Sequence, residues 1–113
     1  MEARATQKYI RVSPQKARLV VDLIRGKNAG EALSILAYTK KRVTQAVEKV
    51  LRSAIANAEQ KAEHLDVDQL VVSQAYVNEG PRSKRIRPAP MGRAYRYQRR
   101  MSHITVVVES PEA

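Results

Sequence analysis

The fold of this 113-residue chain depends most on residues 78–103, which read NEGPRSKRIRPAPMGRAYRYQRRMSH. They include eight basic residues and one acidic residue. Ordinary hairpin loops need only about two to five residues, so a stretch of this length is not a simple loop. Pro88, Pro90 and Gly92 favour a turn near its middle. We therefore expect either a long β-hairpin or a disordered basic loop, because the stretch has little apolar surface to hold itself together.

The segments on either side of this stretch predict β-strands. Residues 70–77 are rich in Val and alternate in the way that suits a strand with two different faces. Residues 104–108, Ile-Thr-Val-Val-Val, form a second clear strand, and residues 6–12 are a weaker third candidate.

The first half of the chain predicts helices. Ser13 followed by Pro14 is a typical helix start, and Gly26 suits its end. Asn28 is expected to cap a short second helix, and Thr39 a longer third one. The apolar residues recur at helical spacing: Ala17, Val20, Val21 and Ile24 in the first helix, Ala32, Ile35 and Leu36 in the second, and Val43, Ala46, Val47, Val50, Leu51, Ala54 and Ala58 in the third.

Together these segments predict an α+β fold in which three helices pack on a small three-stranded antiparallel sheet, with a long protruding basic β-hairpin. We expect one domain, with a globular body of residues 1–77 and 104–113. Residues 78–103 are called the arm below. Counted from Asn78 to Pro90 and fully extended at about 3.3 Å per residue, it would reach roughly 40 Å.

The composition excludes several classes of protein. The chain has no Cys, which rules out disulfides and cysteine-based zinc sites. No apolar segment is long enough for a signal peptide or a membrane span, so no membrane partner is expected. The formal net charge of +10 favours a polyanionic partner, above all nucleic acid.

Catalytic chemistry finds little support. Ser102 and His103 are adjacent on a predicted strand, where their side chains point to opposite faces. We interpret His103 as a strand-edge residue that contacts the sheet or a phosphate. A small acidic group after the third helix is typical of a loop and predicts no metal site; it consists of Glu63, His64, Asp66 and Asp68. We therefore expect that the protein is not an enzyme and binds neither a cofactor nor a small-molecule substrate.

Arginine dominates the predicted binding surface. Its planar guanidinium forms paired hydrogen bonds with phosphate and stacks on bases, which suits structured RNA. Tyr95 and Tyr97 either stack on unpaired bases or pack against the opposite half of the arm. The predicted RNA-binding residues of the arm are Arg82, Lys84, Arg85, Arg87, Arg93, Tyr95, Arg96, Tyr97, Arg99, Arg100 and His103. A second set on the body is Lys8, Arg11, Lys16, Arg18, Arg25 and Lys27.

Four blocks of the sequence resemble a known family. They are Ser13–Lys27, Ser53–Ala58, Asn78–Pro81, and Gly92-Arg93 followed by His103–Val108. In this order and spacing they are similar to bacterial ribosomal protein L-twenty-two of the large subunit. The resemblance implies a cytoplasmic, structural ribosomal protein that binds large-subunit rRNA, aids subunit assembly and is not a homo-oligomer.

The resemblance also implies a role for the tip of the arm. In that family the tip lines the polypeptide exit tunnel, next to neighbouring ribosomal proteins and the nascent polypeptide. By position, the tip is Arg87, Pro88, Ala89, Pro90, Met91, Gly92 and Arg93. This chain has Ala89 and Pro90 where a basic and a small residue are common.

The alternative to a ribosomal protein is a DNA-binding regulator with a helix-turn-helix in residues 13–36, which would leave the arm unexplained.

Overall fold

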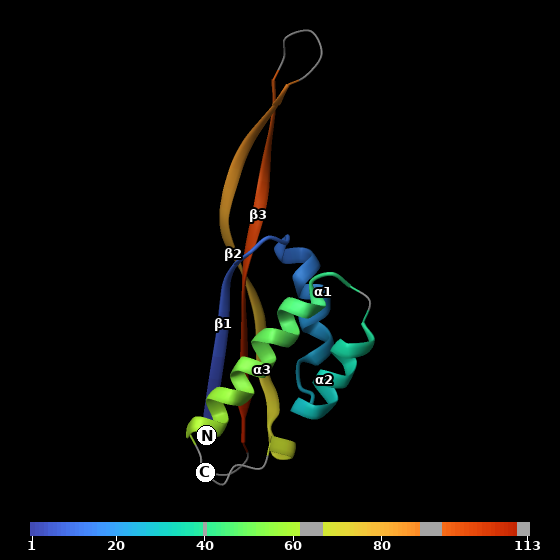
Figure 1. The fold of residues 1–113 in the computed structure, drawn as a ribbon, viewed down its shortest axis with the longest axis vertical. Coiled ribbons are helices and arrows are strands. Elements are labelled where there is room, and N and C mark those ends of the chain that lie inside the picture. Colours follow the sequence, from blue (N-terminus) through green and yellow to red (C-terminus); the bar gives the residue numbers. More distant parts are fainter. Residues whose placement is uncertain (40, 62–66, 89–93, 111–113) are drawn as a thin grey trace.

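A three-stranded antiparallel sheet, covered by three helices, forms the body of the protein in the computed structural model (Figure 1). The structure describes residues 1–39, 41–61, 67–88 and 94–110, and within these ranges only the backbone of Val67 and of residues 82–99. The strands are β1 (Glu2–Ile10), β2 (Val71–Pro88) and β3 (Ala94–Glu109), in the order β1-β3-β2. The predicted α+β fold is confirmed.

The first two helices begin where the sequence indicates. The Ser13 Oγ accepts a hydrogen bond from the backbone N–H of Lys16 at 3.4 Å, and the Asn28 Oδ1 accepts one from that of Glu31 at 3.1 Å. Both bonds satisfy N–H groups that the first helical turn leaves unpaired. Gly26 follows the first helix with a φ of +80°, a conformation that favours glycine. The helices are α1 (Pro14–Ile24), α2 (Ala29–Tyr38) and α3 (Thr44–Lys61).

Thr39 was predicted to begin the third helix, and this prediction is wrong. Thr39 ends α2: its backbone N–H bonds the Leu36 carbonyl at 3.3 Å, and its hydroxyl bonds the Ile35 carbonyl at 2.7 Å. The Thr39 hydroxyl is thus turned back towards α2, where Thr39 is the residue that caps the C-terminal end. The third helix therefore starts later, at Thr44.

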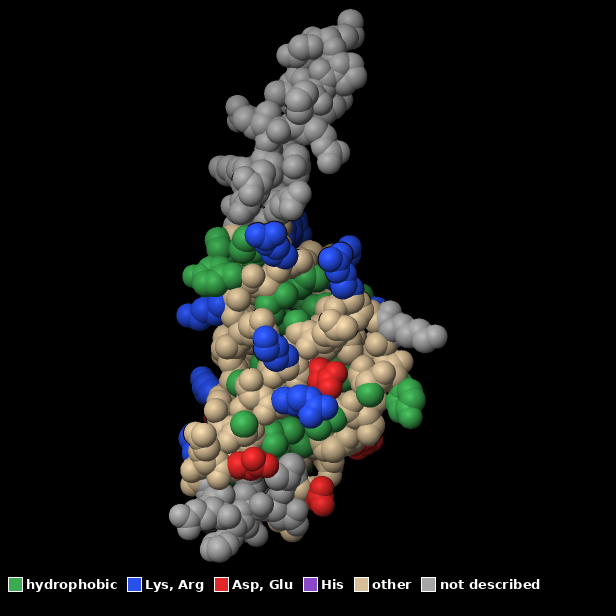
Figure 2. Space-filling view, in the orientation of Figure 1, with side chains coloured by type: hydrophobic (Ala, Val, Ile, Leu, Met, Phe, Trp, Pro, Cys, Tyr) green, Lys and Arg blue, Asp and Glu red, His purple; other side chains and the backbone are tan. Residues whose placement is uncertain are grey.

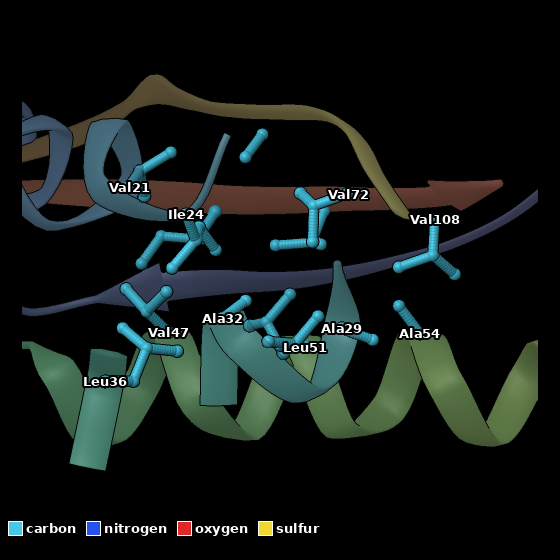
Figure 3. Close-up of a cluster of buried hydrophobic side chains, with 14 of the residues drawn as sticks. Val21, Ile24, Ala29, Ala32, Leu36, Val47, Leu51, Ala54, Val72 and Val108 are labelled. Carbon is cyan, nitrogen blue, oxygen red and sulfur yellow. The ribbon is translucent and has the colours of Figure 1, made fainter. Parts of the chain in front are cut away.

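The core is an aliphatic layer between the helices and one face of the sheet (Figure 3). Alternate residues of β3 enter it, including Val106 and Val108, and they meet fully buried side chains such as Ile24 of α1 and Leu51 of α3. Because the chain has no Phe or Trp, Val, Ile, Leu and Ala fill this layer. Residues 104–108 lie within β3, so the strand predicted there is confirmed.

Side chains of the helices, and of Arg25 directly after α1, bond carbonyls of both outer strands of the sheet. On β2, the Ala75 carbonyl accepts two hydrogen bonds from Arg25, at 2.6 and 3.1 Å, and the Val77 carbonyl accepts one from Arg18 at 3.0 Å. On β1, the carbonyls of Arg4 and Glu2 accept bonds, each at 2.9 Å, from the side chains of Asn57 and Lys61 respectively. These bonds occupy carbonyls that would otherwise offer an edge for pairing with another chain.

Beyond the three-stranded part, β2 and β3 continue as a two-stranded ribbon. Ser102 still pairs with Ile10 of β1 as well as with Glu79 of β2. The two-stranded pairing then runs from Arg82 opposite Arg100 to Pro88 opposite Ala94, and the ribbon projects away from the helices (Figure 1). The molecule measures 66 × 25 × 16 Å, and its radius of gyration is 17.4 Å. A compact chain of this length would have a radius of gyration of about 13 Å, so the arm dominates the shape.

Candidate nucleic-acid interface

The candidate interface begins with the arm. The backbone pairs Arg85 with Tyr97 and Arg87 with Tyr95, so the predicted basic and aromatic residues lie opposite one another in the ribbon. Arg100 is exposed, next to the body. The side chains of the other predicted arm residues, His103 apart, lie outside what the structure describes, and so do residues 89–93 of the predicted tip.

Two β-bulges mark the root of the arm. The register between β2 and β3 shifts between Glu79 and Arg82, where Gly80 and Pro81 both lie opposite Met101. The register between β1 and β3 shifts between Gln7 and Ile10, at nearly the same level of β3. Bulges bend and twist a strand, so the sheet changes direction where the arm leaves the body.

Ser102 and His103 have separate roles at this root. The buried Ser102 hydroxyl donates a hydrogen bond to the Val12 carbonyl at 2.7 Å. The His103 Nδ1 accepts a hydrogen bond from the backbone N–H of Tyr9 at 3.1 Å, and the two rings meet edge to face with centroids 5.1 Å apart. The prediction that His103 lies at a strand edge is wrong, because β3 is the central strand, whereas its predicted contact with the sheet is confirmed by the bond from Tyr9 of β1.

Sequence reasoning missed Tyr9. Its position in the predicted strand gave no sign that its backbone takes a φ of +62°, because that conformation depends on the bulge in β1 and on the His103 ring. Strand β1 ends at Ile10, although the sequence predicted a strand that continues to Val12; the backbone N–H of Val12 instead bonds the Ile10 carbonyl at 2.8 Å in a turn.

The six predicted basic residues of the body fall into two groups. Arg18 and Arg25 donate to carbonyls of β2, and Arg25 also pairs with Asp22 at 2.8 Å. The other four are exposed side chains around β1 and α1: Lys8, Arg11, Lys16 and Lys27. The structure therefore gives intramolecular partners to the two arginines and leaves the four other cations on the surface.

The structure offers little to a small ligand. A depression of about 360 Å³ is lined by Arg4, Asn57, Gln60 and Lys61, and two of these side chains already bond β1. In the part of the chain that is described, no group of three or more His, Cys, Asp or Glu residues could hold a metal ion. Of the acidic group after α3, Glu63, His64 and Asp66 lie outside that part. Within it, no helix combines the length and apolar character that crossing a membrane requires.

Comparison with known proteins gives a consistent result over the whole chain. The sequence profile of the family described as "Ribosomal protein L22p/L17e" matches residues 5–109. A "Large ribosomal subunit protein uL22" of Solibacter usitatus is 66% identical over 113 residues, which cover 100% of this chain and 100% of that protein. A protein of the same description from Oceanobacillus iheyensis is 57% identical over 108 residues, 96% of this chain and 95% of the relative.

Proposed function

Since this chain belongs to the ribosomal protein L22p/L17e family, we propose that it is a structural constituent of the large subunit of the cytoplasmic ribosome. In this role it binds large-subunit rRNA and aids assembly of the subunit. One observation carries the proposal: a two-stranded ribbon of residues 82–88 and 94–100, with seven basic residues and no acidic residue, extends beyond the helices and the third strand.

The positive charge of the arm favours its binding to RNA. A two-stranded hairpin alone is marginally stable in water, and clustered like charges lower its stability further. Phosphate groups on both sides would neutralise the arginines and order the ribbon between RNA segments. Because contacts with phosphate give no information about the base sequence, the protein would recognise the RNA by its shape.

The register supports a role for the tyrosines of the arm. Directly opposite residues of an antiparallel pair share a face, so Arg85 and Tyr97 lie on one face together with Arg87 and Tyr95. Such a face combines cations for phosphate with rings that stack on unpaired bases.

The tip of the arm is the part of the protein that would line the polypeptide exit tunnel. We propose that residues 87–93 reach the polypeptide exit tunnel, where they contact neighbouring ribosomal proteins and the nascent polypeptide. The length of the paired ribbon, which continues to Pro88 and Ala94, supports this reach. Ala89 and Pro90 would make this tip less basic and stiffer than in many relatives.

The body would add a second contact with RNA. Lys8, Arg11, Lys16 and Lys27 are the better candidates, since Arg18 and Arg25 already donate to the sheet. We propose that residues 1–77 and 104–113 fold as one domain that carries the arm. We also propose a monomeric, non-catalytic role without a cofactor. No observation favours the DNA-binding alternative.

Two variants with equal loss of charge test the role of the arm. One carries Arg96→Gln, Arg99→Gln and Arg100→Gln; the other carries Lys41→Gln, Arg42→Gln and Lys49→Gln at exposed positions of the body. Each lowers the net charge from +10 to +7. We expect the arm variant to weaken binding to large-subunit rRNA far more than the body variant, and to reduce the slope of log K against log salt by about 2 to 3.

The measurement is a filter-binding titration at several salt concentrations, with duplex DNA as competitor. Equal losses of affinity in both variants would show that only net charge matters and would refute a binding role of the arm. Displacement of the rRNA by an equal mass of duplex DNA would favour the regulator instead.

A further inference from the structure

Tyr9 holds an unfavourable backbone conformation next to the arm. In the part of the chain that the structure describes, it is the only residue other than glycine with a positive φ, which is +62°. Side chains other than glycine clash with the backbone in this region, so the conformation persists only where the surroundings enforce it. Such strain often accompanies a functional site.

The bulge in β1 explains how Tyr9 comes to the surface. Before the bulge, the odd-numbered residues Ala3 and Ala5 pack against the core; after it, the even-numbered Ile10 and Val12 do so. One extra residue is needed to make this change of face, and Tyr9 lies within it. The Tyr9 side chain consequently remains 62% exposed.

The Tyr9 ring is nevertheless held in place. The His103 Nδ1 accepts the backbone N–H of Tyr9, and the rings are nearly perpendicular, at 88°. His103 itself lies close to Gly80, where an added Cβ would come within 3.2 Å of the His103 Cε1. Whichever ring contributes the edge, the contact leaves at least one face of the Tyr9 ring open.

We propose that Tyr9, supported by His103, is a stacking platform for a single unpaired nucleotide base of structured RNA. The proposal rests on the proposed function, and it names one subsite of that interface. Aromatic rings stack on any base, and a ring fixed in advance loses little entropy when the base arrives.

The charges around Tyr9 favour RNA as the occupant. The exposed Lys8 and Arg11 flank it, and no acidic residue lies between Glu2 and Asp22. Figure 2 shows hydrophobic and basic side chains gathered where the arm leaves the body. An apolar ring among cations suits a base with its phosphates better than an apolar peptide segment.

The test uses the full chain and two RNA hairpins that are identical except for one bulged 2-aminopurine nucleotide. We expect Tyr9→Ala to weaken binding of the bulged hairpin about tenfold or more, and to leave the affinity for the fully paired hairpin within a factor of two. Tyr9→Phe should bind as the unmodified protein does, because the ring remains. The control, Tyr38→Ala, removes an 87% exposed tyrosine at the end of α2 and should change neither affinity.

Tyr9→Gly is the control for a folding defect, because it removes the ring while glycine readily adopts the positive φ. It should lose affinity for the bulged hairpin as Tyr9→Ala does, while circular dichroism shows an intact fold. At saturating protein, 2-aminopurine fluorescence should be quenched by the unmodified chain and less so by both variants. If Tyr9→Ala and Tyr9→Gly lost the same affinity for both hairpins, or lost no affinity for the bulged hairpin, the proposal would be overturned. If the unmodified protein binds neither hairpin and also fails to bind large-subunit rRNA, the proposed function fails as well.

Discussion

Gly80 lies at the bulge where the arm begins, and its missing side chain has a steric reason. A Cβ there would come within 3.1 Å of the Met101 carbonyl carbon and oxygen, which are backbone atoms and cannot rotate away. Gly30, in the first turn of α2, differs: its added Cβ would lie 3.5 Å from the Asn28 Oδ1, an ordinary contact.

The same substitution should therefore have opposite effects at these two glycines. Gly80→Ala is expected to lower the free energy of unfolding by about 1 to 3 kcal/mol, because the crowded strands must shift. Gly30→Ala is expected to raise it by about 0.5 to 1 kcal/mol, because alanine is the better helix former. Urea denaturation of both variants measures these changes. A Gly80→Ala protein as stable as the unmodified chain would show that the bulge is not tightly packed.

At the root of the arm, the sequence drew attention to one of two contacting residues and missed the other. His103 was included among the predicted RNA-binding residues because it lies at the end of the basic stretch. Its partner Tyr9 was not, since a positive φ in a strand arises from a bulge and from a ring that is 94 positions away.

At the scale of elements, each outer strand is covered by one helix. Asn57 and Lys61 are four residues apart on α3, a rise of about 6 Å. The carbonyls that they bond, of Arg4 and Glu2, are two residues apart on β1, a distance of about 7 Å. This match lets one helix face follow one strand edge.

Loss of one edge contact should be measurable. Arg25→Ala removes two hydrogen bonds to the Ala75 carbonyl, and we expect it to lower the free energy of unfolding by about 1 kcal/mol, since the half-exposed guanidinium is partly screened by water. Arg52→Ala is the matched control, because among the described residues Arg52 pairs only with Glu48 on its own helix; its effect should stay within about 0.5 kcal/mol. Thermal or urea unfolding compares the two. Equal effects would show that the contact with β2 adds nothing.

The elements themselves were largely predictable. Ser13 and Asn28 begin helices because a cap depends on only a few neighbouring residues. Thr39 was assigned to the wrong helix, since its hydroxyl can bond either the turn before it or the turn after it. The bonds of Arg18 and Arg25 to β2 were not predicted, because sequence does not reveal that the edge of this strand lies within their reach.

At the scale of the whole molecule, stability should decline along the arm. Residues 104–108 lie in the middle of a three-stranded sheet under helices, whereas residues 82–88 and 94–100 pair only with each other. In the free protein we expect backbone amides of the ribbon to exchange with deuterium at least a hundredfold faster than those of residues 104–108. Binding of large-subunit rRNA should slow exchange in the ribbon most.

Hydrogen exchange followed by mass spectrometry makes this measurement, and peptides of α3 provide the internal reference. If the ribbon of the free protein were already as protected as the central strand, the arm would not need RNA to become ordered.

The sequence by itself determined the number and order of the helices and strands, the long basic segment between the last two strands, and the family, because hydrophobic periodicity, helix caps and clustered charge are properties of neighbouring residues. Only the tertiary structure decided that β3 is central, that two arginines cover the edge of β2, and that Tyr9 meets His103 at the root of the arm. Each of these depends on which distant segments pair, and in what register, and this follows from packing of the complete core rather than from any local pattern.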